Sequence, residues 1–148
     1  MPQLIHSADV RPRVSYRTIL VGPITFERDP EQDNLVRVPG DGLSLMSSDN
    51  DFYPLVRMEV WDGPVAIPEA AWDYEREFHG QLDAHLGVFD LDGCEYGQLS
   101  LQEGRYHIRL LCKGRDHVEA ALVLEEFPPG EPHEDPLEAW LLQLWPSE

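Results

Sequence analysis

Residues 55–61 read LVRMEVW, and apolar side chains alternate there with charged ones. In an extended backbone, Val56, Met58 and Val60 would all lie on one face, and a period of two is typical of a half-buried β-strand. Residues 105–112, RYHIRLLC, repeat this pattern. The apolar positions of this second segment are Tyr106, Ile108, Leu110 and Cys112. These two segments predict β-structure whose apolar faces share one core.

The distribution of prolines and glycines along the rest of the chain favours the same fold class. Thirteen prolines and eleven glycines are spread through the sequence and divide it into short segments, as in all-β domains. Further strand candidates are residues 14–26 (with a break at Gly22-Pro23), 43–46, 72–79, 86–91, 97–101 and 118–127. The sequence therefore predicts an all-β fold, an antiparallel β-sandwich of about eight short strands.

The two ends of the chain are less regular. Asp135-Pro136-Leu137-Glu138 is typical of a helix start, and the apolar residues that follow also fit helical spacing. Pro146 leaves room for only about two and a half turns, so we expect a final strand, with one short C-terminal helix as the alternative. Residues 1–148 are expected to form a single domain, with 1–13 as a loose N-terminal arm.

The charge excludes several classes of function. Eleven Lys and Arg against 28 Asp and Glu give a formal net charge of −17. Such a chain lacks the basic face that nucleic-acid binding and docking on anionic membranes require. It contains no long apolar run and no signal-peptide pattern, so we expect a cytoplasmic protein. Two cysteines, Cys94 and Cys112, do not form a disulfide framework.

The acidic residues are concentrated in two segments. Residues 116–148 contain nine acids and no Lys or Arg, and residues 69–103 contain nine acids and one base. Solubility alone would explain such charge, but its self-repulsion is easier to understand if a basic partner protein binds there. The carboxylates expected at that partner-binding surface are Glu125, Glu126, Glu134, Asp135, Asp73, Glu75 and Glu77.

One local string suggests an enzyme instead. Asp90-Leu91-Asp92-Gly93 follows an apolar segment and resembles the nucleophile motif of haloacid-dehalogenase-type phosphatases, which use magnesium. The strand periodicity after it does not match the alternating helices of that family, so an acidic hairpin turn is the competing interpretation. His79, Asp83 and His85 could bind a metal by residue type, but without a zinc spacing signature.

A family resemblance supports the binding interpretation. The Ser15-Tyr16 strand and the late turn and strand Leu101-Gln102-Glu103-Gly104-Arg105-Tyr106 resemble the competence-associated inhibitors of the nuclease that acts on DNA entering the cell. The resemblance implies an inhibitor or immunity role. Together with the acidic charge it leads us to expect a nuclease inhibitor or immunity-type protein, not an enzyme, that blocks a basic nuclease or toxin without a cofactor or a metal. The alternatives are the small magnesium-dependent phosphatase and a ligand- or calcium-binding β-sandwich.

Overall fold

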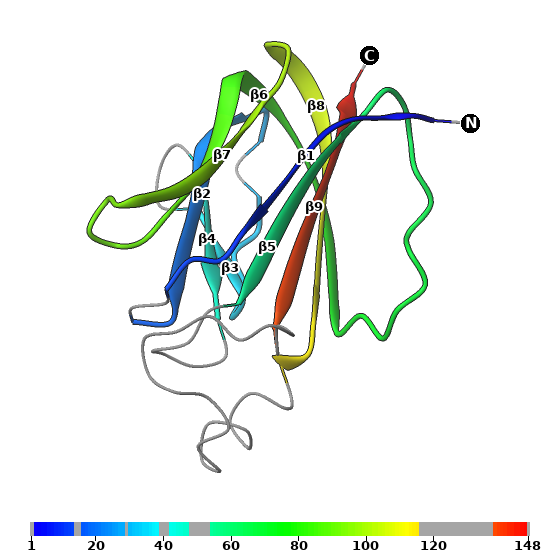
Figure 1. The fold of residues 1–148 in the computed structure, drawn as a ribbon. Coiled ribbons are helices and arrows are strands. Elements are labelled where there is room, and N and C mark those ends of the chain that lie inside the picture. Colours follow the sequence, from blue (N-terminus) through cyan, green and yellow to red (C-terminus); the bar gives the residue numbers. More distant parts are fainter. Residues whose placement is uncertain are drawn as a thin grey trace.

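The computed structural model describes residues 2–13, 16–28, 30–38, 42–47, 54–115 and 138–147, and all elements within them are β-strands (Figure 1). The all-β prediction is therefore confirmed for this part of the chain. The strands are β1 (Leu4–Val10), β2 (Thr18–Phe26), β3 (Val36–Arg37), β4 (Leu43–Met46), β5 (Leu55–Trp61), β6 (Tyr74–Phe89), β7 (Glu95–Ser100), β8 (Gly104–Lys113) and β9 (Ala139–Pro146).

All nine strands belong to one mixed sheet. Its order is β1-β5-β9-β8-β6-β2-β4-β3, and β7 pairs with β6 beside this path. Strand β9 lies between β5, to which it is parallel, and β8, to which it is antiparallel. The expectation of a purely antiparallel arrangement is wrong at this pair, because alternation along a strand is the same whichever direction its neighbour runs.

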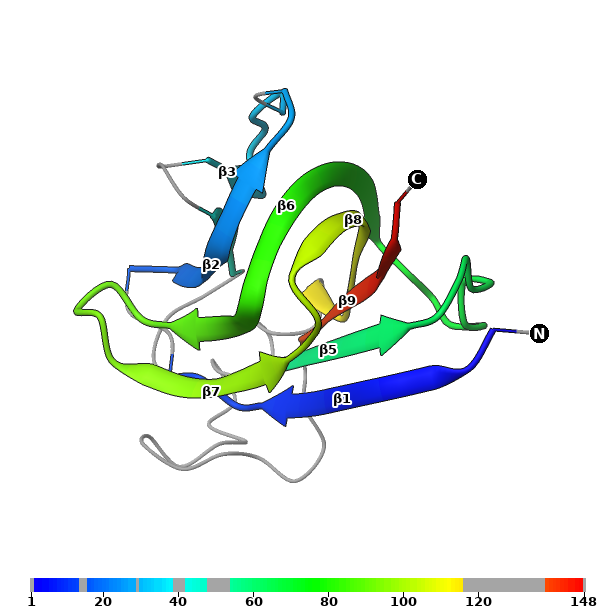
Figure 2. The ribbon, with the colours of Figure 1, turned by 90° about the horizontal axis from the view of Figure 1, so that it is seen from above.

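Strand β6 makes the sheet curl. Its first half, from Tyr74 to Leu82, pairs with β8, and its second half, from His85 to Phe89, pairs with β7 on the same edge. Strand β7 consequently leaves the plane of β8 and approaches β1 (Figure 2). A Cβ atom at Gly97 would lie 2.8 Å from Val10 Cγ2, so the close approach of β7 to β1 requires glycine there.

The main core lies inside this curl. The alternating faces predicted for β5 and β8 are confirmed, since Val56, Met58, Ile108 and Leu110 are fully buried. Trp140 on β9, also fully buried, is the largest of these side chains. A central strand with an apolar residue at every second position can thus be buried on one face along its whole length.

The opposite face of β8 and β9 carries a second, smaller apolar layer. Leu111, Leu141 and Trp145 point away from the main core and are nevertheless buried. Residues 62–73, which connect β5 to β6, run along this face (Figure 1). Arg109 donates a hydrogen bond to the Val65 carbonyl at 2.7 Å, and Lys113 lies over the Trp72 ring. These contacts hold residues 62–73 against the sheet.

Two sequence expectations need correction. Residues 4–10, expected within a loose arm, form β1, whose backbone is hydrogen-bonded to β5. The break expected at Gly22-Pro23 is a bulge inside β2, which continues through a cis peptide bond. The expected final strand is confirmed as β9, in place of the alternative helix, because Trp140, Leu142 and Leu144 fill the main core while Leu141 and Trp145 fill the smaller layer.

No helix in the described ranges has the length and apolar character needed to cross a membrane. The strand expected over residues 118–127 lies outside the described residues.

Candidate protein-binding surface

Asp73, Glu75 and Glu77 lie together at the start of β6, on the face opposite the main core, and all three are exposed. Their exposure at every second position agrees with the strand predicted over residues 72–79. Asp73 is held locally, because its Oδ2 accepts hydrogen bonds from the backbone amides of Gly114, at 2.9 Å, and Arg115, at 3.4 Å. Among the described residues, Glu75 has no ion-pair partner.

Glu77 belongs to a polar and aromatic row that crosses the outer face of the sheet. Its Oε1 lies 2.7 Å from His107 Nε2 and 3.8 Å from Arg109 Nε. The His107 ring stacks on Trp145 at 4.4 Å and meets His79 edge-on at 4.5 Å. Strand pairing places these groups opposite one another, and this long-range order carries no local sequence signal. Glu77 is therefore partly neutralised within the protein.

A buried carboxylate organises one end of the sheet. Glu138 is fully buried, and its Oε2 accepts hydrogen bonds from Ser47 Oγ at 2.6 Å and Trp140 Nε1 at 2.9 Å. Arg115 Nη1 lies 3.4 Å from Glu138 Oε1, and the backbone carbonyl of Glu138 accepts a hydrogen bond from the Leu55 amide at 2.9 Å. Such a buried charge is tolerated because it is paired and hydrogen-bonded. The sequence analysis missed this residue, whose burial no local pattern indicates.

These contacts bring together the attachment points of two acidic segments. Ser47 and Leu55 flank residues 48–53, and Arg115 and Glu138 flank residues 116–137. The predicted residues Glu125, Glu126, Glu134 and Asp135 lie outside the described residues.

The formal charge is divided unevenly along the chain. The described residues contain all 11 basic side chains and 16 of the 28 acids, so the other 12 acids have no basic residue among them. Seven of these acids belong to residues 116–137 and two to residues 48–53. Both segments attach beside Glu138. Nine of these 12 acids therefore belong to segments that begin and end at the same end of the sheet.

The Asp90 string forms the turn between β6 and β7. Asp90 Oδ1 accepts hydrogen bonds from the backbone amides of Asp92 and Cys94, both at 2.9 Å, and Tyr96 donates its hydroxyl to Oδ2 at 3.1 Å. Gly93 has a φ of 87°, a conformation that favours glycine. The strands on both sides are antiparallel, unlike the parallel sheet of the phosphatases. The geometry thus favours the hairpin-turn interpretation.

The described residues contain no cluster of three or more His, Cys, Asp or Glu side chains that could hold a metal ion. His79, Asp83 and His85 are exposed along β6, and the structure does not bring them together as a ligand set.

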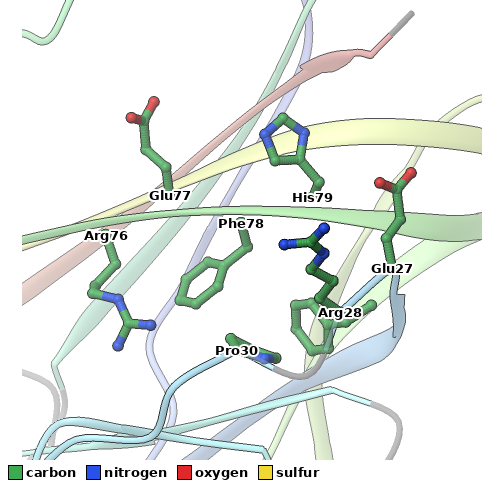
Figure 3. Close-up of a pocket in the computed structure, with 8 residues that line it drawn as sticks. Glu27, Arg28, Pro30, Arg76, Glu77, Phe78 and His79 are labelled. Atoms are coloured by element: carbon green, nitrogen blue, oxygen red, sulfur yellow. The ribbon is translucent and has the colours of Figure 1, made fainter.

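A cleft of about 680 Å³ opens between the end of β2 and the first half of β6 (Figure 3). The rings of Phe26 and Phe78 form its apolar floor, with centroids 5.8 Å apart. The guanidinium of Arg76 lies 4.9 Å from the centre of the Phe78 ring. The remaining lining residues are Glu27, Arg28, Pro30, Glu77 and His79. The sequence analysis missed this cleft, because its two sides are about 50 residues apart in the chain.

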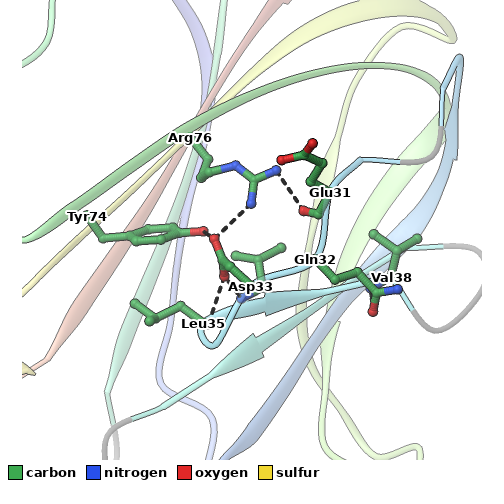
Figure 4. A network of polar contacts seen from close by, with 8 residues as sticks. Glu31, Gln32, Asp33, Leu35, Val38, Tyr74 and Arg76 are labelled. Carbon is green, nitrogen blue, oxygen red and sulfur yellow. Dashed lines mark hydrogen bonds and ion pairs between the residues drawn. The ribbon is translucent and has the colours of Figure 1, made fainter.

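Asp33, in the segment that follows β2, forms hydrogen bonds with side chains of β6 (Figure 4). Its Oδ2 accepts hydrogen bonds from the Tyr74 hydroxyl at 2.7 Å and from Arg76 Nη1 at 2.8 Å, while Oδ1 accepts from the amides of Leu35 and Val36. Partial burial alone would raise the pKa of Asp33, but these four donors outweigh burial and hold the pKa below its usual value. Burial and the adjacent carboxylate raise the pKa of Tyr74.

Comparisons with known proteins identify relatives by fold alone. No family model and no curated protein sequence matches the chain. The solved structure of ComJ, inhibitor of the DNA degrading activity of NucA, from Bacillus subtilis, aligns with a TM-score of 0.61 at 6% identity and covers 99% of each chain. The structure described as Crocagin biosynthetic gene J aligns with a TM-score of 0.59 at 14% identity, over 100% of this chain and 99% of the other. The resemblance expected from the sequence is thus supported at the level of the fold.

Proposed function

We propose that this protein is a nuclease inhibitor that binds a basic face of its target. The whole chain shares its fold with ComJ, which inhibits the DNA-degrading activity of NucA. The observation on which the proposal chiefly depends is that nine acids and no basic residues belong to two segments, 48–53 and 116–137, whose described flanking residues meet at Glu138. Carboxylates presented together can occupy the positions at which a nuclease holds DNA phosphates.

Two groups of residues make up the proposed binding surface. The first is Glu125, Glu126, Glu134 and Asp135, in the segment that attaches at Arg115 and Glu138. The second is Asp73, Glu75 and Glu77, and its Asp73 accepts a hydrogen bond from the amide of Arg115, the residue from which the segment of the first group continues. Within the described part of the chain, Asp73 and Glu75 have no ion-pair partner, although Asp73 accepts hydrogen bonds from two backbone amides.

Charge reversal tests which acids matter. Replacing Glu125, Glu126, Glu134 and Asp135 with lysine should slow association with the nuclease, because electrostatic complementarity acts mainly on the association rate. The matched control reverses Asp83, Asp92, Glu95 and Glu103, which are exposed and lie on β6, β7 and the turns next to them. Both variants change the net charge equally, so a general field effect would slow them equally and contradict the proposed surface.

The assay begins with the protein itself. The chain is immobilised and exposed to an extract of the source organism at low salt, and eluted fractions are tested for degradation of plasmid DNA with and without added free chain. We expect a retained nuclease that the free chain inhibits. Retained fractions without nuclease activity, or with activity that the chain leaves unchanged, would contradict the proposed function.

Salt then tests the mechanism. The Debye length falls from about 10 Å at 0.1 M to about 3 Å at 1 M, so the stopped-flow association rate should drop steeply over this range. The dissociation rate should change less, because contacts excluded from water are poorly screened. An association rate that does not respond to salt would refute charge complementarity even for a true inhibitor.

A further inference from the structure

The cleft between β2 and β6 has an unusual charge balance for so acidic a protein. Its two carboxylates are engaged by partners outside it, since Glu27 pairs with Arg105 and Glu77 with His107 and Arg109. Arg76, on its wall, is paired with Asp33. The remaining charged group in the lining is Arg28, and no carboxylate of the described residues lies within ion-pair distance of it.

Arg28 stands over an apolar floor. Its guanidinium reaches into the cleft (Figure 3). Phe78 and Phe26 present tilted rings there, and Pro30 lines the same space. Pockets for small molecules typically have volumes of about 300–1,000 Å³, with apolar surface and polar groups that fix orientation, and this cleft combines such a volume with an apolar floor and charged groups around it.

We propose that this cleft binds a small planar aromatic anion. The aromatic part of such a ligand would lie against the Phe26 and Phe78 rings, where stacking and burial of apolar surface favour binding. Its carboxylate, sulfonate or phosphate group would accept hydrogen bonds from the Arg28 guanidinium, whose planar donors suit oxyanions. This site is separate from the acidic binding surface, and the proposal does not depend on the inhibitor function.

A fluorescent pair of probes separates the charge from the ring system. 8-Anilinonaphthalene-1-sulfonate is an aromatic anion, and N-phenyl-1-naphthylamine has nearly the same rings without the charge. At about 0.15 M salt the Debye length is about 8 Å, so remote carboxylates contribute little. We expect saturable binding of one sulfonate probe per chain, with shifts of the backbone amide resonances of residues 26–28 and 76–79.

Matched variants test the role of Arg28. Arg28→Gln should weaken binding of the sulfonate about tenfold, the loss expected for one charge-assisted hydrogen bond, and leave the uncharged probe unaffected. Arg28→Lys should retain part of the affinity, because the charge remains while the planar donors are lost. Arg37→Gln on β3 is the control, because it removes the same charge from an exposed residue outside the cleft.

Three results would overturn the proposal. Equal weakening by Arg28→Gln and Arg37→Gln would show an effect of net charge alone. Amide shifts confined to other residues, or binding of the sulfonate that does not saturate, would show that the cleft is not the site. Arg28 is exposed, so its variants should fold normally, and unchanged thermal unfolding is the check on that expectation.

Discussion

Replacing Asp33 with asparagine should destabilise the protein at neutral pH and have progressively less effect in acid. Asparagine keeps one oxygen, which can still accept from the Leu35 and Val36 amides as Asp33 Oδ1 does. Its NH2 group would stand where Oδ2 now accepts from Arg76 at 2.8 Å, so two donors would face each other. The charge-assisted bond to Arg76 is the main interaction lost.

The size of the effect follows from the exposure of this ion pair. A hydrogen bond to a charged group stabilises a protein by about 1.5–3 kcal/mol, and an exposed ion pair by about 0.2–1 kcal/mol. The side chains of Arg76 and Asp33 are 23% and 37% exposed, which places the pair between these cases. After allowing for solvent screening, we expect a loss of about 1–2 kcal/mol in the free energy of unfolding near pH 7.

The pH dependence identifies the cause. The pKa of Asp33 is lower in the folded protein than in the unfolded chain, where the pKa of an aspartate is about 3.9. The stabilisation by its charge is therefore complete above that value and disappears as the pH falls through the folded pKa. Urea unfolding at several pH values should show the variant and the natural protein converging in acid.

The control for this experiment is Asp92→Asn, at an exposed residue in the turn between β6 and β7 that takes no part in the hydrogen bonds of Asp33. A difference between Asp33→Asn and the natural protein that stays constant as the pH falls would refute the electrostatic explanation. A loss near pH 7 as small as that of the control would show that the network does not stabilise the fold.

Ile108→Ala, in the main core, should cost about 2–5 kcal/mol in urea unfolding, and a loss under about 0.5 kcal/mol would mean that the faces of β8 are reversed. Asp90→Asn retains an oxygen for the turn amides and should cost under about 1 kcal/mol, whereas Asp90→Ala should cost about 1–3 kcal/mol more; equal losses would contradict the turn role. Thiol titration of the native protein should label the exposed Cys94 at once. Cys112, whose pKa burial and the nearby Glu138 raise, should react only on unfolding, so prompt reaction of both thiols would contradict its burial.

Local alternation was sufficient to predict the strands that line the core. Residues 55–61 and 105–110 alternate because one face of each strand meets apolar side chains and the other meets polar groups or solvent, and Leu111 interrupts the pattern in β8 because it belongs to the smaller apolar layer. Strand β6 instead gave two separate predictions, at residues 72–79 and 86–91. Its middle residues Asp83, Ala84 and His85 are all exposed, where pairing changes from β8 to β7, so the period of two is interrupted.

The candidate sites were predictable only where they depend on residue type. The sequence located the acidic residues and predicted the strand over residues 72–79 that carries Glu75 and Glu77. It could not indicate that Glu77 is paired with β8 or that Glu138 is buried, because both depend on contacts between distant segments. The cleft beside Arg28 likewise arises from the packing of β2 against β6 and has no counterpart in local periodicity.

The position of β9 has a consequence for how the protein is made. Residues 139–146 are synthesised after all the other described strands, yet they fill the centre of the sheet between β5 and β8. Until these residues leave the ribosome, β5 and β8 each have an edge of unpaired backbone groups beside exposed apolar side chains, a state open to pairing with other chains. Shielding of nascent chains by a chaperone should therefore matter most just before β9 emerges, and strand β9 itself completes the sheet in a single late step.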